Sequence, residues 1–202
     1  MKRYIVVAGN IGSGKTSLVE FLAKRYPIEP CFEPNDTNPY LEDFYKDMKR
    51  WAFHSQIYFL SSKFRFHKQL ESRSTSVIQD RSIYEDAEIF ATNLHRSRRM
   101  NRRDFETYWS LYETIRKELR PPDLLIFLRC STRAIRQRIR SRGRAMEQEI
   151  PVGYLRRLNQ LYDAWIEHYD LSPVLEIPTH KVDYVTDLLD RHDLIKKIEQ
   201  YL

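Results

Sequence analysis

The sequence predicts a doubly wound α/β fold, in which a five-stranded parallel sheet carries helices on both faces, as one domain over residues 1–202. Short apolar runs alternate along the chain with longer segments of helical length and period. The runs Ile5–Ala8 and Leu124–Leu128 are continuously apolar, which is typical of strands covered on both faces. A glycine-rich turn follows the first run, as it does at strand-to-helix connections of this fold class.

Each element has a local reason in the sequence. The first strand is a β-branched run, and the first helix begins where the glycines end. Pro121 and Pro122 end one helix just before the fourth strand. The expected strands are Tyr4–Ala8, Glu29–Phe32, Ser76–Gln79, Leu124–Leu128 and Val174–Ile177. The expected helices are Lys15–Arg25, Lys49–Glu71, Ile83–Leu94, Arg103–Lys117 and Val152–Tyr169.

Charge and composition limit the function classes. The formal net charge of +6 indicates an anionic partner, and a small polyanion suits it better than nucleic acid, because no zinc-finger, basic-zipper or RNA-recognition motif is present. Cys31 and Cys130 lie beside apolar runs, as buried reduced thiols do. No apolar run reaches the roughly 20 residues that span a bilayer. We therefore expect a soluble, cytoplasmic protein that binds neither nucleic acid nor membrane.

The run from Gly9 to Thr16 fits the pattern G-x-x-x-x-G-K-[ST] and predicts a phosphate-binding loop. Its glycines let backbone N–H groups turn onto phosphate oxygens, Lys15 can reach the β- and γ-phosphates, and the Thr16 hydroxyl can ligate Mg²⁺. The following helix adds the positive end of its dipole. The residues expected to hold the nucleotide are Gly9, Asn10, Ile11, Gly12, Ser13, Gly14, Lys15 and Thr16.

Charged residues also follow the second and third strands, at the edge of the sheet where open α/β proteins bind ligands. Glu33 could accept the proton of an acceptor alcohol, or it could cap the next helix. Asp80 could hold Mg²⁺, while Arg81 could steer the acceptor oxygen or pair with Glu33; an ordinary surface ion pair is the alternative. A cradle, a cation site and a base in one crevice would suit phosphoryl transfer.

The stretch from Arg136 to Arg144 alternates arginine with other residues around one glycine, Gly143. So much positive charge indicates a segment that does not pack, and the glycine favours a bend. We expect an arginine-rich, mobile lid over residues 136–148, whose guanidinium groups neutralise charge at the γ-phosphate in the transition state. A solvated helix face is the alternative interpretation.

Several short sequence motifs, spread over nearly the whole chain, follow one another in a characteristic order. They are Gly9–Thr16, Glu33-Pro34, Asn38–Leu41 with Phe44–Asp47, Gln56–Leu60, Asp80–Asp86, and Arg142–Arg144 with Glu147. Together they resemble the deoxynucleoside kinases, and within that family the bacterial deoxyadenosine/deoxyguanosine kinases. The resemblance implies a P-loop nucleoside kinase domain with ATP and Mg²⁺ as cofactors, and a homodimer that pairs through a helical face.

The resemblance also assigns roles to single positions. It implies that Glu33 is the general base for the nucleoside 5′-hydroxyl, that Arg81 lies beside it, and that Asp80 lies near Mg²⁺. The remaining positions match residues that hold the sugar, the base or the phosphates. Tyr45 and Glu147 match the pair that binds the 3′-hydroxyl, Gln56 the reader of the base edge, Phe90 a ring that stacks on the base, and Arg138, Arg142 and Arg144 the lid arginines.

Fewer residues bear on the choice of base. A glutamine amide such as that of Gln56 can bond adenine in bidentate fashion, but with the amide rotated it can also serve cytosine or guanine. Asp86 adds an acceptor, which favours a base with an exocyclic amino group. Lys63 replaces an arginine of several relatives, and Phe59 is bulky where some pyrimidine-accepting relatives have small residues. We expect deoxyadenosine, with deoxyguanosine, deoxycytidine or a broad deoxynucleoside specificity as alternatives.

Two other functions fit parts of the sequence. A thymidylate-type monophosphate kinase shares the fold and the Asp-Arg pair, but Glu33 would repel its phosphorylated acceptor. A non-enzymatic nucleotide-sensing or nucleic-acid-binding module could use the same loop, but it leaves Tyr45, Gln56 and Glu147 without a role. We therefore expect ATP-dependent phosphorylation of a deoxynucleoside in nucleotide salvage, with the donor adenine near Asp183–Asp190.

Overall fold

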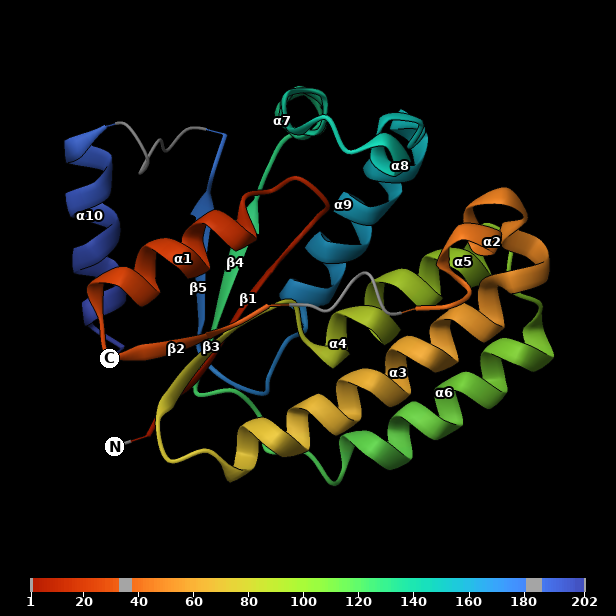
Figure 1. Cartoon of the computed structure of the whole chain (residues 1–202), viewed down its shortest axis with the longest axis horizontal. Coiled ribbons are helices and arrows are strands. Elements are labelled where there is room, and N and C mark those ends of the chain that lie inside the picture. Colours follow the sequence, from red (N-terminus) through yellow and green to blue (C-terminus); the bar gives the residue numbers. More distant parts are fainter. Residues whose placement is uncertain (1, 33–37, 181–186, 202) are drawn as a thin grey trace.

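The computed structural model describes residues 2–32, 38–180 and 187–201 of the chain. Five parallel strands form one sheet in the order β2-β3-β1-β4-β5 (Figure 1). They are β1 (Tyr4–Gly9), β2 (Ile28–Cys31), β3 (Ser76–Asp80), β4 (Leu124–Arg129) and β5 (Val174–Pro178). The predicted fold class and all five predicted strands are therefore confirmed, and their ends differ from the predicted ends by at most one residue.

Helices and one π-helical segment fill the connections between the strands. They are α1 (Lys15–Arg25), α2 (Leu41–Lys46), α3 (Met48–Ser72), α4 (Ile83–Glu85), the π-helical segment η2 (Asp86–Ala91), α5 (Thr92–Arg96), α6 (Arg102–Arg116), α7 (Thr132–Arg142), α8 (Ala145–Gln148), α9 (Val152–Glu167) and α10 (Leu188–Glu199). The five expected helices are present, although the one expected at Ile83–Leu94 consists of α4, η2 and α5 in succession. Of the segment Asp183–Asp190, which is expected to meet the donor adenine, residues 183–186 lie outside the described residues, and Leu188–Asp190 belong to the first turn of α10.

The two faces of the sheet carry separate apolar cores, because successive strand residues point to opposite sides. On one face, Ile5 and Val7 pack with residues of α1 and α10. On the other face, Tyr4, Val6 and Ala8 pack with residues of α3, η2 and α9. The helix α6 lies outside α3 and packs against it and η2, which adds a further layer on that side (Figure 1).

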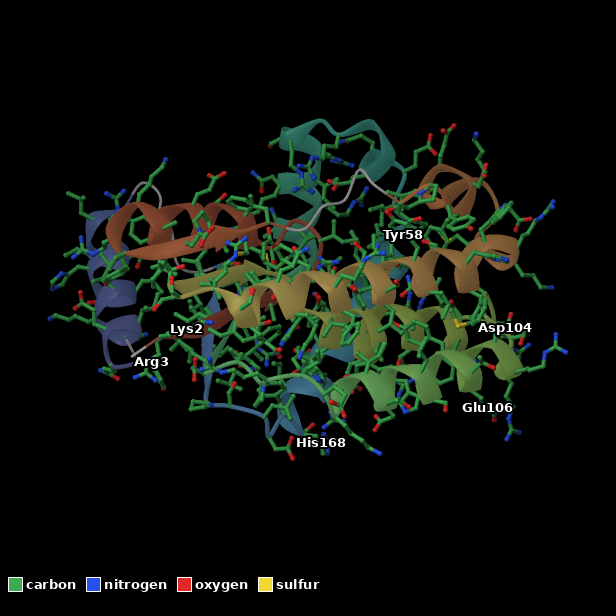
Figure 2. All side chains as sticks on the ribbon, turned by 60° about the horizontal axis from the view of Figure 1, so that its bottom comes forward. Lys2, Arg3, Tyr58, Asp104, Glu106 and His168 are labelled. Carbon is green, nitrogen blue, oxygen red and sulfur yellow. The ribbon has the colours of Figure 1, made fainter. Side chains whose placement is uncertain are left out.

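The amino-terminal end of the sheet is tied to the long helix α3. The Lys2 ammonium donates hydrogen bonds to the carbonyl oxygens of Leu70 and Glu71, in the last helical turn of α3. Figure 2 labels Lys2 near that end of the helix. A cation at that position also interacts favourably with the negative end of the helix dipole. Cys31 and Cys130 are buried free thiols, as expected. Among the residues that the structure describes, no helix combines the length and the apolar composition needed to cross a bilayer.

Candidate active site

The phosphate loop runs from the end of β1 to the start of α1, as the sequence predicts. Gly9, Gly12 and Gly14 have φ angles of 149°, 73° and 104°, in the region that side chains rarely adopt, so the loop needs glycine at these places. The Lys15 ammonium donates to the carbonyl oxygens of Gly9, at 2.9 Å, and Asn10, at 3.1 Å. The cation is thereby held against the loop, at the positive end of α1.

Thr16 and Asp80 meet beside this loop. β1 and β3 are neighbours and Val7 is in register with Asp80, so the end of β3 lies next to the start of the loop. The Thr16 hydroxyl donates a hydrogen bond of 2.6 Å to the Asp80 carboxylate. Hydroxyl and carboxylate oxygens are the hard ligands that Mg²⁺ prefers, typically one or two carboxylates completed by phosphate and water. The two side chains therefore fit a magnesium site.

Arg81 follows Asp80 in a strained turn. Its φ angle is 63°, which is uncommon for any residue with a side chain. The Arg81 N–H donates to the carbonyl oxygen of Val7, and the Arg81 carbonyl accepts a 2.9 Å hydrogen bond from the Gln79 side chain. The guanidinium then lies over the ring of Phe90, 4.4 Å from its centre. Backbone strain of this kind persists only where the surroundings fix it, which is common at functional sites.

A cavity of about 280 Å³ opens at this edge of the sheet. Its lining combines cations, acceptors and rings from the phosphate loop, α2, α3, η2, the α7–α8 region and α9. The lining residues are Ile11, Gly12, Lys15, Thr16, Leu41, Phe44, Tyr45, Gln56, Phe59, Asp80, Arg81, Asp86, Phe90, Arg142, Arg144, Glu147, Ile150 and Tyr154. The structure thus gathers most of the residues singled out in the sequence around one cavity, from positions up to more than a hundred residues apart.

Some of the predicted site residues are not among the described residues of the cavity lining. The general-base candidate Glu33 is outside the described residues, which end at Phe32 on that side of the gap and resume at Asn38. Lys63 and Arg138 do not line the cavity, and neither do the loop residues Gly9, Asn10, Ser13 and Gly14.

The acceptors Gln56 and Asp86 lie on two different elements that face the cavity, α3 and η2. Gln56 is 5% exposed, and its side-chain oxygen accepts no hydrogen bond from the residues that the structure describes. The Asp86 carboxylate forms a 3.1 Å ion pair with the ammonium of Lys63, which does not line the cavity, and both side chains are buried. A buried acceptor without a protein partner is unfavourable unless a ligand supplies the donor.

The arginine-rich segment is better packed than the sequence suggests. The expectation that its charge prevents packing is wrong, because α7 buries Ile135 and Ile139 against Leu155. The arginines occupy the other faces of this helix, so its charge and its packing do not compete. Gly143 ends α7 with a φ of 70°, the bend that the sequence predicts.

The three lid arginines fall into two groups. Arg142 and Arg144 line the cavity and both form ion pairs with Glu147. Arg138 instead donates to the carbonyl oxygen of Ser13, at 2.8 Å, and to that of Thr179, at 2.6 Å. Its guanidinium therefore joins α7 to the back of the phosphate loop and to the end of β5.

Leu41, Phe44, Ile150 and Tyr154 complete the apolar wall of the cavity, although the sequence analysis gave them no role. Leu41 and Phe44 lie on α2, the short helix that also carries Tyr45. Their signal was the spacing of apolar residues three apart beside Tyr45. Burial raises the pKa of the Tyr154 phenol far above its ordinary value, so this side chain stays neutral even where an exposed tyrosine would ionise.

A larger cavity of about 510 Å³ lies between α6, η2 and α9. It is lined by aromatic side chains such as Trp109 and Trp165 and by Glu88, and it contains none of the predicted site residues. The smaller cavity is therefore the candidate active site, because it alone of these two combines a phosphate loop with acid and base groups.

Comparison with known proteins agrees with an active site that binds phosphate at this cavity. Residues 5–202 match the sequence profile of the deoxynucleoside kinase family. A deoxyadenosine/deoxycytidine kinase of Bacillus subtilis is 38% identical over 198 residues, which cover 96% of this chain and 90% of that protein. A deoxyguanosine kinase of Lactobacillus johnsonii is 36% identical over 203 residues, which cover 96% of this chain and 90% of that protein.

The fold is similar to that of a solved enzyme as well. The structure of deoxyadenosine kinase from M. mycoides with the products dCMP and a flexible dCDP bound superposes with a TM-score of 0.86. It is 29% identical to this chain, and the match covers 98% of this chain and 100% of that one. The likeness therefore extends over the sheet and the helices together.

Proposed function

Because this chain belongs to the deoxynucleoside kinase family, we propose that it transfers the γ-phosphoryl group of ATP to the 5′-hydroxyl of a 2′-deoxynucleoside, with deoxyadenosine as the preferred acceptor. The product would be the nucleoside monophosphate, as in nucleotide salvage. Family membership alone does not specify ATP as the phosphate donor, adenine as the preferred nucleobase or the roles of single residues; these are what the proposal adds.

On the donor side, the phosphate loop would cradle the triphosphate and Lys15 would contact its β- and γ-phosphates. Thr16 and Asp80 would hold Mg²⁺, which when bound neutralises charge on the phosphate oxygens. Arg142 and Arg144 line the cavity, and their guanidinium groups would stabilise the charge that develops on the transferring group. The Arg138 contact with Ser13 supports a role in fixing the loop that holds the phosphates.

On the acceptor side, Glu33 would take the proton of the 5′-hydroxyl, with Arg81 beside it. The placement of β2 supports this role, since Cys31 is in register with Gln79 and the chain therefore leaves the sheet next to the Asp80–Arg81 turn. Tyr45 and Glu147, both in the cavity lining, would bind the 3′-hydroxyl, and the Phe90 ring would stack on the base.

One observation carries the choice of base: Gln56 and Asp86 both line the cavity, and both carry acceptor oxygens. Two acceptors select a base that carries an exocyclic amino group, which thymine lacks. The NH₂ group of the Gln56 amide can at the same time donate to a ring nitrogen, so that one amide matches the N6 and ring-nitrogen edge of adenine. The bulk of Phe59 beside them favours one defined position of the ring.

A competition assay tests this proposal. The enzyme is given Mg-ATP with the four deoxynucleosides and adenosine together, and the monophosphates are separated and quantified. We expect deoxyadenosine monophosphate to form fastest and adenosine to react poorly, because Tyr45 would lie against the sugar. Faster phosphorylation of deoxyguanosine or deoxycytidine would overturn the base preference, and the absence of any monophosphate would overturn the kinase activity.

We also propose that the chain forms a homodimer through a helical face. The support is the resemblance to the family together with the aromatic side chains at the surface between α6 and α9. Light scattering on the purified protein would give twice the 24.5 kDa mass of the chain, whereas a single-chain mass over the whole working concentration range would contradict the dimer.

A further inference from the structure

Glu85, at the end of α4, carries a buried carboxylate that binds residues outside the cavity lining. Its side chain is 0% exposed, and it does not itself line the candidate active site. One carboxylate oxygen, Oε1, accepts hydrogen bonds from the Gly9 N–H at 3.1 Å and from the Tyr162 hydroxyl at 2.8 Å. The other, Oε2, accepts the Ser82 N–H at 2.9 Å and lies 3.5 Å from the Ser82 hydroxyl.

Helix capping explains only half of this arrangement. Ser82 and Glu85 form a capping box, in which the third helical residue accepts the N–H of the cap. Capping does not require the contact of Oε1 with Gly9, which lies 76 residues earlier in the chain and begins the phosphate loop. Burial of a carboxylate is unfavourable unless its oxygens are well hydrogen-bonded, so the two backbone donors and the phenol are what allow it there.

The two backbone groups that Glu85 binds each lie beside a residue of the proposed chemistry. Gly9 is held at its N–H by Glu85 and at its carbonyl oxygen by Lys15. Ser82 directly follows Arg81, whose left-handed backbone is held at its N–H by Val7 and at its carbonyl oxygen by Gln79. One carboxylate thus connects the donor-side loop to the acceptor-side turn, and Tyr162 anchors that carboxylate to α9.

We propose that Glu85 is a positioning residue for phosphoryl transfer, which keeps the phosphate loop and the Arg81 turn at a fixed separation. The inference rests on the proposed roles of Lys15 and Arg81, and it adds that their relative placement depends on a group that touches neither substrate. Displacements of about 1 Å between reacting groups can cost on the order of 10²-fold in rate.

Substitution of Glu85 tests the inference. Glu85→Gln keeps the size of the side chain but offers one acceptor oxygen, so that its NH₂ group must face either the Gly9 N–H or the Ser82 N–H. Glu85→Asp keeps the charge but is one methylene shorter and does not span the two donors. For both variants we expect kcat to fall about 10- to 100-fold while KM for the deoxynucleoside and for ATP changes less than about threefold.

Two control variants distinguish positioning from general stabilisation. Glu88→Gln removes the half-buried carboxylate three residues further along, which also accepts from a tyrosine, Tyr112, but faces the larger cavity. Tyr162→Phe removes the third contact of Glu85 and leaves both backbone contacts. We expect both controls to retain the parent kcat when assayed well below their melting temperatures, even where those temperatures are lowered.

Hydrogen exchange on the unaltered protein gives a second test that does not depend on the folding of any variant. If one carboxylate holds both donors, the Gly9 and Ser82 amides should be protected and should exchange through the same opening event. Rapid exchange of Gly9 beside a protected Ser82 would overturn the inference. So would a kcat close to that of the parent in folded Glu85→Gln and Glu85→Asp, or an equal loss in Glu88→Gln. An inactive parent enzyme would instead overturn the proposed function.

Discussion

The Thr16 hydroxyl donates a 2.6 Å hydrogen bond to the Asp80 carboxylate, and this contact joins the first turn of α1 to the end of β3. It brings two hard oxygen ligands together although they lie 64 residues apart in the chain. The contact depends on the sheet order, because only the neighbouring placement of β1 and β3 puts Asp80 beside the phosphate loop.

The first prediction concerns this pair. Asp80→Asn replaces a charged ligand with a neutral one, so we expect the Mg²⁺ concentration needed for half-maximal activity to rise roughly 10- to 100-fold. A magnesium titration of the initial rate at saturating ATP and nucleoside measures it. Asp193→Asn, on the exposed surface of α10, should leave the titration unchanged. An unshifted titration in Asp80→Asn would show that this carboxylate does not hold the metal.

The second prediction concerns the proposed base. Glu33→Gln keeps the shape of the side chain but not its ability to take a proton, and we expect kcat to fall about 10²- to 10⁴-fold with little change in KM. Steady-state kinetics with deoxyadenosine measure both constants. Glu29→Gln is the matched control, since Glu29 is an exposed residue of β2 that pairs with Arg73 and should have no effect on kcat. Near-normal turnover of Glu33→Gln would remove Glu33 from that role.

The third prediction concerns the buried pair of Lys63 and Asp86. Lys63→Met leaves the Asp86 carboxylate buried without its ammonium partner, and loss of one member of a buried pair costs about 3–5 kcal/mol of unfolding free energy. Urea denaturation measures the change. Lys46→Met breaks an exposed pair with Glu42 and should leave stability unaltered. Equal effects in the two variants would contradict the importance of burial.

The fourth prediction concerns pH. His67 is buried beside Tyr4 and the Arg120 carbonyl oxygen, and desolvation lowers its pKa below 6.5 even though the Glu71 carboxylate, 3.3 Å away, raises it. Because the folded-state pKa is lowered, the unfolded chain binds the proton more tightly. The stability contributed by neutral His67 is therefore fully present above pH 6.5 and is lost as the pH falls from there through the lowered folded-state pKa.

His67→Gln should accordingly weaken the dependence of the unfolding free energy on pH between about 5 and about 7. Urea denaturation at several pH values in that window gives the slope. His192→Gln, on the exposed surface of α10, should keep the slope of the parent. A slope that persists in His67→Gln would assign the pH dependence to other groups.

The sheet was predictable because its strands are buried on both faces, so that Ile5–Ala8 and Leu124–Leu128 are apolar without interruption. The short helix α2 was missed, since six residues carry too little periodicity to distinguish them from a loop. The π-helical turn of η2 was also missed, because no local pattern in the sequence marks it. In α7 the arginines concealed two isoleucines at helical spacing, Ile135 and Ile139, which were the signal of packing.

The candidate site was predictable where a motif or a strand end marks it, as for Lys15, Thr16, Asp80 and Arg81. It was not predictable where the role depends on a contact between distant segments. Arg138 and Arg142 belong to one arginine-rich run, yet one binds the back of the phosphate loop and the other lines the cavity. Glu85 resembles an ordinary capping residue until the fold places Gly9 against it.

The strands of the parallel sheet run from one edge of the molecule to the opposite edge, so their amino ends and carboxyl ends lie far apart. Lys15, Thr16, Asp80 and Arg81 lie at the carboxyl ends of the strands, whereas Thr75 precedes β3 at the opposite edge of the sheet, on an exposed connection. The five residues of β3, at about 3.3 Å each, put roughly 16 Å between that connection and Asp80. A fluorophore or surface tether attached at Thr75 would therefore report on the protein, or immobilise it, while leaving the nucleotide cleft open.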